Sequence, residues 1–505
     1  MDLIVGVDLG TTHLKAGAFT VRGEQTALAL EPTPVRHLPD GGGEHEAEEL
    51  WSGVARCLAR IAAQVKGRIA GIGVASMAEA GVLLDADDRP LGPVIAWYDP
   101  RTRPQAAALA RLPGREYLFR RTGLFVHPKH GLCKLLWLKE ERPAIFARGA
   151  SWLNLAEYAA FRMTGCKASC PTLAARTLAY DLVSGRWAGD LLRELEVPAE
   201  LFPSILPEGR LLGTLRGEAA AAAGLPADIP VALAGHDHPC ACLSAAAAEP
   251  GVLLDSAGTS EALLGAIPAP ALTDKACAAQ ISQGPLPLPD LYGLQTGSPA
   301  GGGSLDWLRR TFFPGRSFAE LEEEATTAGE SPTGLLFLPH LAGSGPPAAD
   351  PEARGALVGL TYGADRGRVI KAILEGACYE LRLMVETMES VTGRPFHRLV
   401  AVGGQARSRL WMQLKADILG RTFAVPEEGE ATLLGAALLG GVAGGVFPDV
   451  RAAAAAPVRK ESAVVPRPGS GARYEGYYRS YRRLRAVLRP LFHAWPADEA
   501  GGPPF

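Results

Sequence analysis

The sequence predicts an α/β protein built from two related domains. The chain has 505 residues, which is too long for one hydrophobic core and typical of two large or three smaller domains. A strand, a Gly-Thr turn and a second strand occur at residues 3–20, and the same pattern returns at residues 252–264. Chance is the alternative, because both residue types are common at turns. The recurrence indicates a duplicated α/β domain whose two turns could face each other across a cleft.

Hydrophobic periodicity predicts the remaining elements. Strands are expected where a few apolar residues run together before a glycine, aspartate or proline, at residues 69–74, 82–84, 94–97, 231–234, 335–339 and 399–402. Helices are expected where apolar residues recur every three or four positions, at residues 46–66, 132–140, 153–163, 240–248, 305–312, 368–391, 408–419, 431–444 and 474–492. We expect residues 101–230 to be mainly helical, 21–43 to be irregular and 452–471 to form an Ala/Pro-rich linker.

Composition narrows the classes of partner. The net charge is −3 and no basic cluster with interleaved aromatic residues needs explaining, which argues against nucleic acid and an anionic membrane surface. The eight cysteines include no C-x-x-C pair, as expected for reduced thiols in the cytoplasm. The longest apolar run, residues 433–447, is too short and glycine-rich to span a bilayer. Because a strand pattern begins the chain, we expect no signal peptide and a cytoplasmic protein.

The first strand pair carries residues suited to binding phosphate. Gly10 lets the backbone approach a ligand closely, and Thr11 and Thr12 add hydroxyl and N–H donors. Lys15 adds a positive charge, and Asp8 can hold Mg²⁺ directly or through water. Many hairpins carry a Gly-Thr turn and bind nothing, so an ordinary turn is the alternative.

Three further glycine-rich turns end strands or open helices, at residues 258, 301–303 and 403–404. Each could present N–H groups to an anion, although such loops are usually only turns. Taken with the first turn, they fit an extended nucleoside triphosphate. The sequence has no G-x-x-x-x-G-K-[ST] loop, and Gly71-Ile72-Gly73 lacks the third glycine of a dinucleotide fingerprint.

A carboxylate follows the predicted strand at residues 231–234. Asp237 there could accept the proton of a substrate hydroxyl during phosphoryl transfer, or it could simply cap the next helix. His236 and His238 flank it and allow a zinc site, hence a metallohydrolase. Isolated H-x-H pairs are usually ordinary polar residues, and the sequence shows no further ligand cluster.

Polar residues also follow other strands. Glu79 follows one strand, Trp97 and Asp99 follow another, and Lys129 lies in a polar group with neighbouring histidines at positions 127 and 130. Together they could form a polyol site, with carboxylates on hydroxyls and an aromatic ring on the carbon face. For each group alone, capping, surface or core packing is the alternative.

These residues carry a resemblance to the FGGY carbohydrate kinase family, within the actin/hexokinase/heat-shock-protein ATPase superfamily. It covers nearly the whole chain. The supporting segments are residues 8–12 (DLGTT), 97–101 (WYDPR), 122–123, 134–137 (KLLW), 235–237 (GHD), 258–260 (GTS), 350–355 with 359–360, 403–408 (GGQARS) and 416–420, followed by the Tyr-rich helix from 474.

The resemblance implies two actin-like (ribonuclease H-like) domains with a central cleft, at residues 1–246 and 247–505, the second ending in the helix at 474–492. It implies ATP and Mg²⁺ as cofactors, a small sugar as substrate, with a ketose (pentulose or hexulose) or a polyol expected, and a homodimer as a common state. It places Asp237 as the general base, Asp8 by Mg²⁺ and Glu79 on substrate hydroxyls. The nucleotide residues that it implies are Thr11, Thr12, His13, Lys15, Gly258, Thr259, Gly302, Asp306, Gly404 and Ser408. Trp97, Asp99, Lys129 and His238 complete the expected substrate site.

Departures from the family pattern concern the substrate. The segment 76–81 reads SMAEAG where xylulokinase-like members have Gln-Met-His-Gly, and Ala78 stands where glycerol kinase has arginine. Lys129 stands where glycerol kinase has an aromatic residue, and His238 replaces a commoner Asn or Gln. Lys129 with the nearby histidines allows an acidic sugar, although an exposed lysine is the commoner explanation. A non-catalytic actin-like ATPase that acts on a protein partner is the other alternative.

Overall fold

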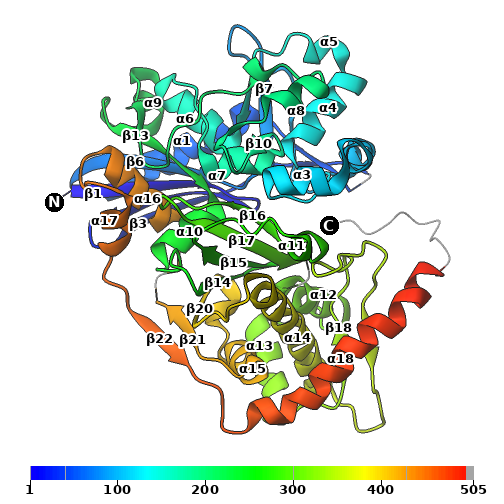
Figure 1. Cartoon of the computed structure of the whole chain (residues 1–505). Helices are drawn as coiled ribbons and strands as arrows, with labels where there is room; N and C mark the ends of the chain where they lie inside the picture. The colour runs from blue at the N-terminus through cyan, green and yellow to red at the C-terminus, as the bar shows by residue number, and fades with distance from the viewer. Residues whose placement is uncertain (1, 40, 300, 428, 496–505) are drawn as a thin grey trace.

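The computed structural model describes residues 2–495 except residues 40, 300 and 428. The last residues of the expected second domain, 496–505, lie outside the described residues. Two mixed sheets organise the molecule, one formed by the first half of the chain and one by the second (Figure 1). All strands of the first large sheet lie before residue 237, and all strands of the second lie after residue 251.

The two large sheets share one topology, which supports duplication of the fold. The first has the order β12-β13-β6-β1-β2-β3, and the second has the order β16-β17-β15-β14-β20-β21-β22. In each, the initial strand pairs antiparallel with the next strand and parallel with a later one: β1 with β2 and β6, β14 with β15 and β20. The strands of the first sheet are β1 (Asp2–Leu9), β2 (His13–Thr20), β3 (Gln25–Pro32), β6 (Arg68–Ser76), β12 (Leu211–Thr214) and β13 (Pro230–His236). Those of the second are β14 (Val252–Ala257), β15 (Glu261–Ile267), β16 (Ser282–Pro285), β17 (Tyr292–Ser298), β20 (Arg398–Val402), β21 (Phe423–Pro426) and β22 (Glu461–Val464).

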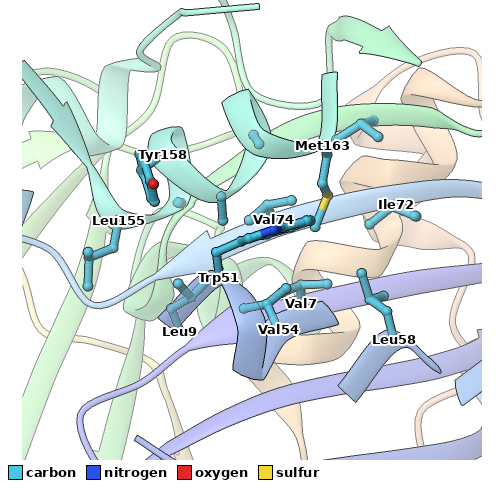
Figure 2. Close-up of a cluster of buried hydrophobic side chains, with 14 of the residues drawn as sticks. Val7, Leu9, Trp51, Val54, Leu58, Ile72, Val74, Leu155, Tyr158 and Met163 are labelled. Atoms are coloured by element: carbon cyan, nitrogen blue, oxygen red, sulfur yellow. The ribbon is translucent and has the colours of Figure 1, made fainter. Parts of the chain in front are cut away.

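Amphipathic helices cover the sheets. In the first half, α1 (Ala47–Gln64) packs mainly on β2 and β3, and α6 (Leu155–Thr164) packs mainly on β6 and β13. Figure 2 shows Trp51 of α1 and Met163 of α6 close to Val74 of β6 in this core. The other helices are α2 (Arg103–Leu109), α3 (Arg115–Thr122), α4 (Gly131–Glu141), α5 (Pro143–Phe146), α7 (Pro171–Ala174), α8 (Gly189–Glu194), α9 (Gly217–Ala223), α10 (Asp237–Ser244), α11 (Asp274–Ala278), α12 (Gly302–Phe312), α13 (Phe318–Thr326), α14 (Arg366–Thr392), α15 (Arg409–Leu419), α17 (Val450–Ala455) and α18 (Ser470–His493).

One helix of the second half packs on the first sheet. Helix α16 (Ala431–Ala443) lies beside β1 and β6, where Leu433 and Leu438 join Ile4 and Phe19 in one apolar cluster (Figure 1). Facing glycines allow near-backbone contact, since a Cβ on Gly440 would lie 2.4 Å from the Gly73 nitrogen. Helix α16 therefore ties the two halves together.

The structure corrects several expected elements. The segment 21–43 holds β3 and β4 (Arg36–His37), and the expected linker 452–471 holds the end of α17, β22 and the start of α18. The helix expected at 153–163 starts at Leu155, after β9 (Ser151–Asn154), and the one expected at 240–248 is α10, which starts at Asp237. The segment 101–230 also contains β10 (Tyr180–Asp181), β11 (Arg186–Trp187) and β12. The remaining short strands are β5 (Gly43–His45), β7 (Gly81–Leu84), β8 (Val94–Ile95), β18 (Leu336–Leu338) and β19 (Ala356–Val358). In the described part of the chain, no helix is long and apolar enough to cross a membrane.

Candidate active site

Strand register brings three of the predicted site segments to one sheet edge. β1, β6 and β13 run parallel, and Leu9 and His236 both lie opposite Ser76. The carboxyl ends of these strands therefore sit side by side, and ligands of α/β sheets bind at such ends. The Gly10 turn, the Glu79 segment and Asp237 follow directly from this edge.

Asp237 is the first residue of α10 and is held by its two histidine neighbours. Its Oδ1 accepts the backbone N–H of His238 at 2.6 Å and lies 3.1 Å from the His236 Nε2. Burial alone would raise the pKa of Asp237, but the two histidines and this N–H bond outweigh it and bring the pKa to about 2. Asp237 is thus a carboxylate at neutral pH, ready to accept a proton. Ligand atoms of His236, Asp237 and His238 lie within 4.8 Å of one another, so the metal alternative is geometrically possible.

Asp8 lies in the same group of acids. It is 7% exposed, and its Oδ1 has no hydrogen-bond partner among the described residues. Burial, with repulsion from Asp237, raises the pKa of Asp8 to about 8. Lys15 partly offsets this effect, but its Nζ bonds Glu430 Oε2 at 2.8 Å, just before α16. A buried, unpaired carboxylate beside other acids is a suitable environment for a divalent cation.

The turn at Gly10, which is predicted to bind phosphate, contacts Trp97 of the expected sugar site. The Trp97 Nε1 donates to the Thr11 hydroxyl at 3.1 Å, so the indole lies against the turn. Thr11 and Thr12 are exposed, and His13 begins β2 partly buried. The hydroxyls of this turn are therefore accessible to a ligand.

Glu79 anchors a buried polar cluster that joins the two halves. It adopts a left-handed φ of 65°, and its Oε1 accepts from Arg176 Nε at 2.9 Å and from the same guanidinium's Nη2. Lys129 Nζ lies 3.4 Å from the same oxygen. Burial alone would raise the pKa of Glu79, but Arg176 and Lys129 hold it well below its usual value. Arg176 also donates from Nη1 to Gln295 Oε1 of β17 at 3.1 Å.

A buried lysine fixes the two segments that carry Glu79 and Trp97. Lys134 of α4 donates to the carbonyl oxygens of Ile95 at 2.8 Å, Ala96 at 3.1 Å and Glu79. Burial lowers the pKa of Lys134 to about 7. The carbonyl ligands hold the two loops in a fixed relation, because a buried ammonium needs acceptors. His130 acts similarly, since its Nδ1 lies 3.0 Å from the carbonyl oxygen of Arg176.

The glycine turns of the second half also converge. Gly302 donates its N–H to the Gly258 carbonyl at 3.0 Å, Gly303 donates to Thr259 at 2.8 Å, and a Cβ on Gly403 would lie 2.5 Å from the Ala257 carbonyl oxygen. The fully buried Lys415 joins the two strands on either side of the Gly258 turn, because its Nζ bonds Asp255 of β14 at 2.6 Å and Glu261 of β15 at 2.5 Å.

Some predicted residues are already engaged in structural contacts. Both oxygens of Asp99 accept bonds from Arg101, and Oδ2 also accepts the Gly43 N–H. Asp306 pairs with Arg309 at 2.8 Å and Arg310 at 2.9 Å, and the Ser408 hydroxyl caps α15. His238 lies beside Asp237, whereas Gly404 is exposed. The ligand contacts of these residues stay predictions.

Three residues of the site are absent from the sequence predictions. Arg176, Gln295 and Glu430 lie in segments without a motif, and each reaches the site through a contact between elements far apart in the sequence. One feature of the sequence could have pointed to Arg176. Ala78 stands where glycerol kinase has an arginine, so a positive charge at that place would have to come from another segment of the chain.

Comparisons with known proteins agree with this geometry. The N-terminal domain model of the FGGY family of carbohydrate kinases matches residues 3–244, and the C-terminal domain model matches residues 253–444. The chain belongs to the FGGY family of carbohydrate kinases. It is therefore a sugar kinase, as predicted, and kinases of this family use ATP. Membership in a family of kinases argues against the metallohydrolase and non-catalytic alternatives, and the role of Asp237 stays a prediction.

Individual relatives span the chain from end to end. It is 28% identical to a xylulose kinase of Bacillus subtilis, over 97% of this chain and 98% of that protein. It is 32% identical to a glycerol kinase of Thermus brockianus, over 96% and 98%. The solved structure of a xylulose kinase from Rhodospirillum rubrum is 28% identical, with a TM-score of 0.88 over 97% of this chain and 100% of that one. The predicted actin-like two-domain fold is confirmed.

Proposed function

We propose that this kinase transfers the γ-phosphoryl group of ATP to a hydroxyl of a small ketose or polyol, with Asp237 as general base. The position of Asp237 carries the proposal: an ionised carboxylate at the end of β13, beside the Gly10 turn and the Glu79 cluster. The similarity to xylulose and glycerol kinases supports a ketose or polyol.

The transfer follows from this arrangement. The substrate hydroxyl attacks the γ-phosphorus, its proton passes to Asp237, and the bond to the bridging oxygen of ADP breaks. Thr11, Thr12 and the Gly258-Thr259 turn would bind the phosphates, and the turns around Gly302 and Gly404 the rest of the nucleotide. Glu79 and Trp97 would orient the sugar. Exclusion of water between the two halves limits ATP hydrolysis.

Mg²⁺ is part of the proposal, and the residues present fit it. Asp8 offers a buried carboxylate oxygen without a partner, close to Asp237. The ion would neutralise charge that develops on the phosphates. We further propose the domain boundary at residues 246/247 and a cytoplasmic reaction, whereas a homodimer stays a prediction.

A coupled ADP-release assay over pentuloses, hexuloses and polyols tests the proposal. Asp237→Asn should lower kcat by about 10²- to 10⁴-fold, because the general base is lost, while the Kd for ATP changes little. Asp190→Asn is the matched control, since Asp190 pairs with Arg121 on the surface of α8. Normal kcat in Asp237→Asn would remove the general-base role, and stoichiometric bound zinc would favour a hydrolase.

A further inference from the structure

The Glu79 cluster holds more positive than negative charge. Arg176 and Lys129 both contact the same oxygen, Oε1 of Glu79. The side chains of Arg176 and Glu79 are 7% and 8% exposed, and that of Lys129 is 27% exposed. Lys129 is therefore drawn into the site rather than extended into solvent, which removes the ordinary explanation for a lysine in this segment. The contacts with Oε1 leave Oε2 of Glu79 as an acceptor for a substrate hydroxyl.

Among the described residues, Glu79 is the one carboxylate that forms an ion pair with Arg176 or Lys129. Burial lowers the pKa of His130 well below its usual value and also lowers the pKa of His238, so both rings are neutral at neutral pH. Asp237 is the other nearby acid, and its Oδ1 is engaged by His236 and by the His238 N–H. The cluster therefore sets two basic side chains against one carboxylate, and although burial and Arg176 lower the pKa of Lys129, Glu79 partly offsets this effect.

The site is thus electrically polar along its length. The ionised Asp237 makes the phosphoryl-transfer side of the site negative, and Arg176 and Lys129 place positive charge around Glu79. Buried charges in proteins are normally paired, and an unmatched cation beside a ligand site attracts an anion. An arginine held in place by hydrogen bonds, as Arg176 is by Glu79 and Gln295, is a strong donor to carboxylates.

We infer that the substrate is a sugar acid: a short polyol or ketose that also carries a carboxylate, which Lys129 and Arg176 bind beside Glu79. This inference rests on the proposed kinase function and narrows its substrate class. The carboxylate takes no part in the transfer and leaves unchanged, so the proton and phosphoryl balance is that of any hydroxyl. Its role is to orient the chain of carbons so that one hydroxyl lies beside Asp237.

Matched substrates that differ only in the carboxylate test the inference. The pairs are glycerate against glycerol, xylonate against xylitol and gluconate against sorbitol, assayed by ADP release and by the quenching of tryptophan fluorescence on binding. For at least one pair, kcat/KM and affinity should favour the acid by about 10- to 100-fold, as expected for a charge-assisted contact. Lys129→Gln should reduce this ratio at least tenfold, mainly through KM, and added salt should weaken the binding of the acid more than that of the alcohol.

Lys139→Gln provides the matched control, because Lys139 of α4 pairs with Glu196 and its side chain has a similar exposed fraction of 30%. It should leave the acid-to-alcohol ratio as in the unmodified protein. Preference for the neutral member of every pair, or a ratio that Lys129→Gln does not change, overturns the inference while leaving the kinase function intact. Turnover with no sugar, acidic or neutral, contradicts the proposed function, and the binding measurement then decides the charge preference separately.

Discussion

The buried carboxyl group of Asp8 makes the stability of the folded protein depend on pH. The pKa of Asp8 is raised to about 8 from 3.8, so the folded protein keeps a proton that the unfolded chain releases above about pH 4. Stability therefore falls as pH rises between these values. Asp8→Asn removes this dependence and should raise the free energy of unfolding at pH 8 by about 1 to 3 kcal/mol, while it lowers turnover. Thermal unfolding followed from pH 4 to 8 measures the effect.

The surface variant Asp190→Asn should not change this pH dependence, because Arg121 lowers rather than raises the pKa of Asp190. At pH 8, Mg²⁺ with nucleotide should raise the free energy of unfolding of the unmodified protein more than that of Asp8→Asn, because the variant lacks the carboxylate that would bind the ion. If Asp8→Asn instead melts at a lower temperature than the unmodified protein at pH 8, the Asp8 carboxylate has a stabilising partner in the protein without ligand.

Individual site residues were predictable only where a strand end marks them. Asp8 lies near the end of buried β1, Glu79 and Asp237 follow the buried strands β6 and β13, and the sheet aligns those ends. Arg176 was not predictable, because its side chain reaches Glu79 from a segment about a hundred residues away. Asp99 illustrates the opposite case: the sequence cannot distinguish a carboxylate that meets a ligand from one that Arg101 neutralises.

At the scale of elements, the sequence predicts the long helices with strong hydrophobic periodicity well, but it does not predict the edge strands. Long helices such as α14 and α18 were expected almost at their observed bounds, because their apolar stripes are continuous. Strands β3 and β22 were missed, since each is an edge strand with a largely exposed face and turn-forming neighbours. Their identity is set by pairing with β2 and β21, which no local pattern records.

Helix α16 gives a prediction at the same scale. A Cβ on Gly440 would lie 2.4 Å from Gly73 N and 2.6 Å from the Ile72 carbonyl carbon, and backbone cannot move aside locally. Gly440→Ala should therefore lift α16 from β6 and lower the free energy of unfolding by about 2 kcal/mol or more. Thermal or urea unfolding of purified protein measures this loss.

Gly476→Ala in α18 is the control, because nothing lies within 4 Å of a Cβ at that helical position. It should raise stability by about 0.5 to 1 kcal/mol through the higher helix propensity of alanine. Equal effects of the two substitutions would show that α16 is not closely packed on the first sheet.

At the scale of the whole molecule, the sequence predicted two duplicated domains but not how they communicate. The shared strand order of the two sheets bears out the repeated Gly-Thr pattern. The contacts between the halves involve Lys15 with Glu430 and Arg176 with Gln295. These pairs are separated by 415 and 119 residues, so only the fold brings them together.

The Arg176–Gln295 contact predicts coupling between sugar and nucleotide binding. Arg176 bonds Glu79 in the proposed sugar site, and Gln295 belongs to β17, in the sheet whose turns would hold the nucleotide. Nucleotide that draws the second half closer should strengthen this bond and thereby fix Arg176 for the sugar. The affinity for sugar should therefore rise in the presence of a non-hydrolysable ATP analogue, and Gln295→Ala should reduce that increase by roughly 1 kcal/mol, or about fivefold.

Calorimetric titration of the sugar with and without the analogue measures both affinities, and reciprocity requires the same factor when the nucleotide is titrated. Gln413→Ala is the matched control, since Gln413 bonds Asp417 and the Val465 carbonyl within the second half. It should leave the coupling factor unchanged. Full coupling in Gln295→Ala would place communication in the other contacts between the halves, which include Lys15–Glu430, Arg120–Asp274 and the packing of α16 on β1 and β6. If Gln295→Ala loses the coupling and Gln413→Ala keeps it, Arg176 links domain closure to the sugar site. Its one guanidinium contacts both Glu79 and Gln295.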